Sequence, residues 1–133
     1  MGEIDRPRPR IVVADEDPAV LALVVATLRQ DGNAVFHAYD ALSAVELVFA
    51  LDACHLLISN TRVEGVAGID LIRQLRVRRP DLPIVYLANT GRSTPELEAA
   101  LPPDVPVLRE PFTAAGLRTV VHALLAKGRA PGH

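Results

Sequence analysis

Five short apolar runs, each followed by a segment with helical periodicity, constrain the fold of this chain more than any other feature. The runs lie at residues 11–14, 34–38, 54–59, 84–88 and 105–108. The first run is continuously apolar, which is typical of a strand buried on both faces of a parallel sheet. Strands that alternate with helices form a parallel sheet covered on both faces. The sequence therefore predicts an α/β fold with five parallel strands.

Capping residues and prolines mark where the helices begin and end. Asp17 followed by Pro18 is a typical N-cap and first helical residue, and an apolar stripe follows at the spacing of one helix face. The fourth helix should be short, because Pro102-Pro103 stops it. The other helix starts are expected at these caps: Asp40 or Ser43, Ser93 or Thr94, and Thr113.

Composition narrows the class of protein. A chain of 133 residues, half of them apolar, is suited to one domain, which we expect at residues 10–127 between a flexible leader (1–9) and a flexible tail (128–133). A net charge of −2 gives no sign of a nucleic-acid surface, and no apolar stretch reaches the ~20 residues that cross a membrane. The single cysteine, Cys54, fits a reducing compartment, so we expect a cytoplasmic protein.

Polar residues follow several of the predicted strands directly. In a parallel α/β sheet, the functional crevice lies at the carboxyl ends of the strands. Asp15, Asn60 and Glu110 each occupy such a position, and Ala88 ends the fourth run. Topology alone therefore predicts that these residues lie near one another.

Three tracts in this order resemble the receiver domain of bacterial response regulators. They are the acidic run 15–18, the segment 56–71 with its two glycines, and Glu110-Pro111-Phe112. The resemblance extends from about Arg10 to Lys127. It implies a flavodoxin-like (βα)5 three-layer sandwich with strand order 2-1-3-4-5.

The resemblance also implies a phosphoryl-transfer site, from which this sequence departs. Asp15 and Glu16 match the acidic pair that holds Mg²⁺ in the family. Asn60 stands at the phosphoacceptor position, where its neutral amide is not a competent nucleophile. Glu110 replaces the family's lysine, which reverses a charge. Two more switch positions are altered, the hydroxyl position by Ala88 and the aromatic position by Val107.

We therefore expect an atypical receiver that signals by protein–protein contact, without phosphorylation of position 60 and without enzyme activity. Its partner would be a kinase, another regulator or a second copy of the chain, and neither a nucleic acid nor a membrane. No cofactor is expected, although weak Mg²⁺ binding at Asp15 and Glu16 stays open. The alternatives are a phosphorylatable receiver with an unusual acceptor, and a metal or ligand sensor that uses the acidic pocket.

Two expectations concern contacts. The clustered carboxylates should repel, so that one has a raised pKa or pairs with Arg62 or Arg92; alternatively, Glu110 points into solvent. The partner surface is expected on the face made by the fourth helix, fifth strand and fifth helix, where the alternative is a monomer with a merely solvated face. Its residues would be Leu97, Leu101, Val107 and Arg118.

Overall fold

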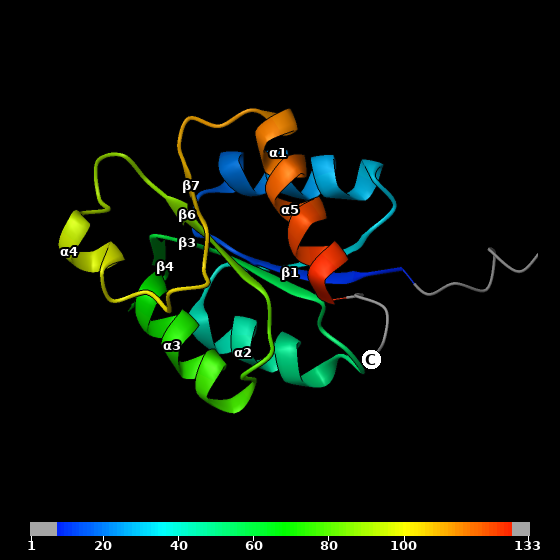
Figure 1. Ribbon diagram of the computed structural model, residues 1–133, viewed down its shortest axis with the longest axis horizontal. Helices are drawn as coiled ribbons and strands as arrows, with labels where there is room; N and C mark the ends of the chain where they lie inside the picture. The colour runs from blue at the N-terminus through cyan, green and yellow to red at the C-terminus, as the bar shows by residue number, and fades with distance from the viewer. Residues whose placement is uncertain (1–7, 129–133) are drawn as a thin grey trace, which may run out of the picture.

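A five-stranded parallel sheet forms the centre of the fold (Figure 1). The computed structural model describes residues 8–128. Its strand order is β2-β1-β3-β6-β7, and every neighbouring pair is parallel. The flavodoxin-like fold class and the strand order expected from the sequence are thus confirmed. The strands are β1 (Arg10–Ala14), β2 (Ala34–Ala38), β3 (Leu56–Asn60), β6 (Ile84–Ala88) and β7 (Val107–Arg109).

Helices cover both faces of this sheet, as Figure 1 shows. In β1, Ile11 and Val13 pack with α1 and α5, whereas Val12 and Ala14 pack with α2 and α3. Burying each such aliphatic side chain contributes ~1.5–3 kcal/mol, which explains why β1 is apolar at every central position. The helices are α1 (Pro18–Gln30), α2 (Ala41–Ala50), α3 (Gly68–Arg78), α4 (Pro95–Glu98) and α5 (Ala114–Gly128).

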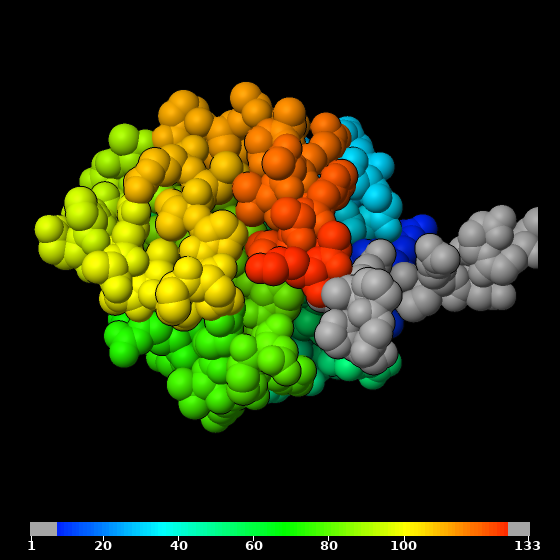
Figure 2. Space-filling view, viewed as in Figure 1, coloured from blue at the N-terminus to red at the C-terminus, as the bar shows by residue number. Residues whose placement is uncertain are grey.

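The capping residues act as the sequence indicates. Asp17 Oδ1 accepts a hydrogen bond from Ala19 N at 2.9 Å, which satisfies a free amide of the first turn of α1. Asp40 rather than Ser43 caps α2, and Thr94 rather than Ser93 caps α4. Helix α4 is a single short turn, and it stands out at the edge of the molecule (Figure 2).

The structure corrects several boundaries. The expected loop between Asn60 and Gly68 contains an antiparallel hairpin, β4 (Arg62–Val63) and β5 (Val66–Ala67), with Gly65 at φ +82° in its turn. Strands of two residues are too short to show a period, so the pattern missed them. Strand β3 starts two residues later than expected and includes Asn60, and β7 begins at Val107 rather than Val105.

The predicted termini lie largely outside the described residues. Residues 1–7 of the expected leader and 129–133 of the expected tail are not described. Among residues 8–128, no helix has the length and apolar character needed to cross a bilayer.

Candidate functional site

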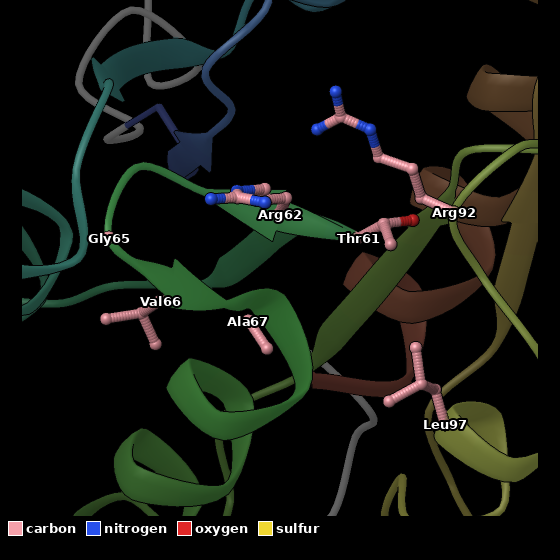
Figure 3. Close-up of a pocket in the computed structure, with 7 residues that line it drawn as sticks. All are labelled: Thr61, Arg62, Gly65, Val66, Ala67, Arg92 and Leu97. Carbon is pink, nitrogen blue, oxygen red and sulfur yellow. The ribbon is translucent and has the colours of Figure 1, made fainter.

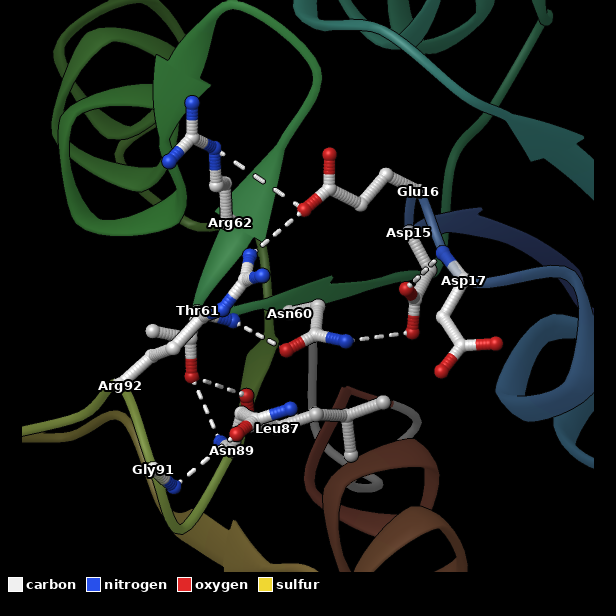
Figure 4. Close-up of polar contacts among 10 residues, drawn as sticks. All are labelled: Asp15, Glu16, Asp17, Asn60, Thr61, Arg62, Leu87, Asn89, Gly91 and Arg92. Carbon is white, nitrogen blue, oxygen red and sulfur yellow. Dashed lines mark hydrogen bonds and ion pairs between the residues drawn. The ribbon is translucent and has the colours of Figure 1, made fainter.

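A buried hydrogen bond between Asp15 and Asn60 lies at the centre of the site (Figure 4). Asp15 follows β1 and Asn60 ends β3, and the pairing of these two strands brings the side chains together. Asn60 Nδ2 donates to Asp15 Oδ2 at 2.7 Å. Asp15 Oδ1 accepts from Asp17 N at 2.8 Å, so both carboxylate oxygens are engaged.

Backbone contacts fix the orientation of the Asn60 amide. Thr61 N donates to Asn60 Oδ1 at 2.5 Å, so the oxygen faces the backbone and the nitrogen faces Asp15. Asn60 is only 5% exposed. The amide oxygen and the amide nitrogen therefore each have a partner of the opposite polarity.

Burial raises the pKa of Asp15 to about 6. Asp15 has no exposed surface, and loss of water around a carboxylate disfavours its charged form. Hydrogen bonds from Asp17 N and Asn60 act against this rise, while the nearby carboxylates of Glu110 and Asp17 add to it. Asp17 N and Asn60 thus supply the two donors that oppose the effect of burial on the pKa of Asp15.

Arginines from β4 and from the loop after β6 pair with Glu16. Arg92 Nη1 lies 2.9 Å from Glu16 Oε1, and Arg62 Nε lies 3.9 Å from the same oxygen. The expectation that these arginines meet the acidic cluster is confirmed for Glu16. Both arginine side chains are more than half exposed, at 61% for Arg62 and 56% for Arg92, so each pair contributes only ~0–1 kcal/mol.

Glu110 does not simply point into solvent. Its Oε2 is buried and accepts no hydrogen bond from the described residues. Burial raises the pKa of the Glu110 carboxyl, and the charge of Asp17 raises it further. Its backbone is held by Glu110 N donating to Ala88 O at 2.9 Å and by the Thr90 hydroxyl donating to Glu110 O. The Glu110 carboxyl therefore lies near enough to Asp15 to raise the pKa of Asp15.

Ala88 and Val107, which match two switch positions of the family, have apolar side chains that pack against the core. Ala88 is 1% exposed at the end of β6, and Val107 packs against the core on the α2–α3 side of the sheet. Neither side chain can donate a hydrogen bond into the site.

Thr61 is a site residue that the sequence reasoning missed. Its Oγ1 donates to Leu87 O at 3.1 Å and accepts from Asn89 N at 2.7 Å, which ties the end of β3 to the end of β6. The sequence does place this hydroxyl residue directly after Asn60, at the end of a strand, and that position could have indicated a site residue. Because both of these hydrogen bonds are to backbone groups, the role of Thr61 is to position the backbone around the site.

Gly68, the first residue of α3, permits the close approach of this helix start to the end of β3. A Cβ at this position would lie 1.8 Å from Asn60 O, which no real side chain allows. Gly68 N also donates to Thr61 O at 2.8 Å. The glycine is therefore required by backbone packing beside Asn60.

The residues present do not fit a tight Mg²⁺ site. Such a site takes several oxygen ligands, usually with carboxylates among them. Both Asp15 oxygens are already hydrogen-bonded, Glu16 pairs with Arg92, and position 60 is a neutral amide. Within residues 8–128, no group of three or more acidic, His or Cys side chains is placed to hold a metal ion.

The four residues of the expected partner surface differ in how far their side chains are exposed. Arg118 lies on α5, and its Nε is 3.0 Å from Asp31 Oδ2 at the end of α1; a contact between Arg118 and a partner stays a prediction. Leu101 and Val107 are partly buried against the core. Leu97 alone of the four is an exposed apolar side chain, at 39%.

Comparison with known proteins identifies the family. The model of the response regulator receiver domain matches residues 11–121. This chain belongs to the response regulator receiver family. It is therefore a receiver domain of two-component signalling, as the sequence tracts indicated.

Curated relatives of this receiver are longer proteins. The chain is 30% identical over 125 residues to the response regulator protein FleR of Pseudomonas aeruginosa, covering 92% of this chain and 26% of FleR. It is 33% identical over 121 residues to the response regulator MprA of Mycobacterium ulcerans, covering 89% of this chain and 50% of MprA. The receiver thus spans half or less of the length of these relatives.

Solved structures share the receiver fold. A response regulator receiver protein from Sinorhizobium medicae superposes with a TM-score of 0.81 at 27% identity, covering 91% of this chain and 97% of that one. A CheY-like receiver domain protein from Methanospirillum hungatei gives a TM-score of 0.82 at 18% identity, covering 95% of this chain and all of that one.

Proposed function

We propose that this receiver signals through contact with a protein partner and without phosphorylation at position 60. The observation that carries the proposal is the buried Asn60–Asp15 hydrogen bond of 2.7 Å. A phosphoacceptor must offer an anionic oxygen to the incoming phosphorus. At position 60 the oxygen belongs to a neutral amide and accepts from Thr61 N, while the nitrogen is committed to Asp15.

The surrounding charges support the same proposal. Phosphoryl transfer needs cations around the transferred group. Here Glu110 stands where the resemblance implies a lysine. The nearby cation, Arg92, already pairs with Glu16. Ala88 has no hydroxyl with which to read a phosphorylated state. We propose a module with no enzyme activity and no resident cofactor, acting in the cytoplasm on a kinase, another regulator or a second copy.

Intact-mass measurement after treatment with acetyl phosphate and Mg²⁺ tests the proposal. The mass of this protein should stay unchanged, because position 60 offers a neutral amide oxygen and not an anionic carboxylate. A receiver with an aspartate at the matched position, treated in parallel, serves as the positive control. A stoichiometric, base-labile phosphate adduct would contradict the proposal and favour a receiver with an unusual acceptor.

A sensor of small ligands is the second candidate, because a small cleft opens at the site, whereas the arginines of this cleft disfavour a divalent cation. A cleft of about 100 Å³ opens above the site, with Asp17 and Asn89 among its lining residues. Arg62 and Arg92 also line it and would repel a divalent cation. We therefore expect no rise in thermal stability with millimolar Mg²⁺, Mn²⁺ or Ca²⁺, since a ligand specific for the folded state would raise it.

A further inference from the structure

A groove runs beside the site, between the β4–β5 hairpin and α4. Its volume is about 490 Å³, which lies within the ~300–1,000 Å³ typical of binding sites in proteins. Figure 3 shows its two sides. Arg62 and Arg92 lie along one side, and Val66, Ala67 and Leu97 lie along the other.

The groove has an excess of positive charge. Its charged lining residues are Arg62 and Arg92, and no acidic side chain of residues 8–128 lines it. Both arginines approach the same oxygen of a single carboxylate, Glu16 Oε1. Glu64 in the hairpin turn and Glu96 in α4 belong to adjoining segments but do not line the groove. The two guanidinium groups share this one carboxylate as their ion-pair partner, and Asp17 lines the adjoining cleft with them.

The apolar side gives the groove a second kind of contact. Leu97 is 39% exposed on α4, and Val66 is half-buried in β5. Arginine is enriched in protein interfaces, and the fully buried centre of an interface is more apolar than the rest of the protein surface. A ligand that matched only the cations would leave this surface in water, so the groove suits a partner with both charged and apolar groups.

We propose that this groove docks an acidic segment of a protein partner. A carboxylate of that segment pairs with Arg92 and Arg62, and an aliphatic or aromatic side chain next to it packs on Val66, Ala67 and Leu97. The proposal rests on the proposed function, because it names where and by what chemistry the partner is bound.

Glu16 acts as an internal competitor in this arrangement. Its Oε1 occupies the position that a partner's carboxylate would take at Arg92, 2.9 Å from Nη1. Docking exchanges one carboxylate for another at the same guanidinium. Removing the charge of Glu16 should therefore strengthen binding, whereas removing an arginine should weaken it.

A second groove of similar size lies elsewhere on the molecule. It lies between α2 and α3, has a volume of about 480 Å³ and exposes Leu42 at 69% and Val77 at 81%. It contains one cation, Arg78, and its lining does not specify an occupant. It therefore serves as an alternative outcome of the test.

The test uses peptides selected for binding to the whole protein from a random twelve-residue library. Selected peptides should pair an acidic residue with a nearby aliphatic or aromatic residue. Their Kd, measured by fluorescence polarisation, should rise ~10-fold or more with Arg62→Gln or Arg92→Gln and fall at least ~3-fold with Glu16→Gln. Arg73→Gln, an exposed arginine of α3 outside the groove, is the matched control and should change Kd by less than ~2-fold.

Several results would overturn the inference. They are the absence of any selected peptide, selection without acidic residues, and selection of carboxylates without an apolar neighbour. NMR titration with a selected peptide would also overturn it if the backbone amide signals that shift belong to the α2–α3 groove. An unchanged or weakened affinity with Glu16→Gln would also overturn it. The phosphodonor experiment reports on the proposed function separately: a phosphate adduct refutes that function whatever the peptides do, and an unchanged mass without peptide binding refutes only the groove.

Discussion

Replacing Asp15 with asparagine should make the protein less stable at acid pH and more stable at alkaline pH. Asp15 is fully buried, and its pKa of about 6 in the folded state lies above the ordinary value of 3.8. A carboxyl with a raised folded-state pKa stabilises the protein fully below its unfolded pKa, and this contribution is lost as pH rises through the folded pKa. The window for Asp15 therefore runs from about pH 4 to about pH 7.

The magnitude follows from the two pKa values. A difference between about 6 and 3.8 corresponds to about 3 kcal/mol of unfolding free energy lost by pH 8. The substituted amide would keep one acceptor oxygen, so it could serve Asp17 N or Asn60 Nδ2 but not both. That lost hydrogen bond costs about 1–2 kcal/mol at every pH. Asp15→Asn should thus be less stable than the natural protein at pH 4 by about 1–2 kcal/mol, and more stable at pH 8 by a similar amount.

Urea unfolding of both proteins at pH 4, 6 and 8 measures this crossing. Asp52→Asn is the matched control, because Asp52 is exposed, and its effect should vary little with pH. A constant stability difference for Asp15→Asn across the three pH values would refute the reasoning, since it would mean that the Asp15 pKa is not raised by burial.

Two further substitutions probe the site. Asn60→Asp puts a second carboxylate beside Asp15 and should cost ~2–4 kcal/mol at pH 8 and less at pH 5, as measured by urea unfolding. It should not restore efficient switching, because Glu110 and Ala88 are unchanged; equal stability at both pH values, or switching at the level of an ordinary receiver, would contradict this. Gly68→Ala should cost at least ~3 kcal/mol or prevent folding, because its Cβ would meet Asn60 O at 1.8 Å. Gly91→Ala, where the nearest atom would be 3.7 Å away, should cost less than ~1 kcal/mol, and similar losses for the two alanine variants would refute the packing argument.

Local patterns in the sequence were sufficient for the elements of the fold. The continuous apolar run of β1 predicts a strand buried on both faces, and Asp17-Pro18 predicts the start of α1, because strand burial and helix capping depend on residues close in the chain. The charges of the site residues could also be read from the sequence. Asn60 is neutral, and Glu110 is negative where the resemblance implies a positive lysine. Strand-end topology also placed both near Asp15. The order of the strands came from the family resemblance.

Contacts between distant segments were decided by the tertiary structure. Asp15 and Asn60 are 45 residues apart, and Glu16 and Arg92 are 76 apart, so only the packing of β1 against β3 and the course of the loops set their distances. Arg118 illustrates the same limit, because its position in α5 did not reveal that Asp31, 87 residues away, would bind it. The two hydrogen bonds of Asp15, the backbone contacts of Thr61 and the groove beside α4 depend on atoms brought within about 3–4 Å by folding. Sequence periodicity reports which face of an element is buried, whereas these distances arise only when all the elements pack at once.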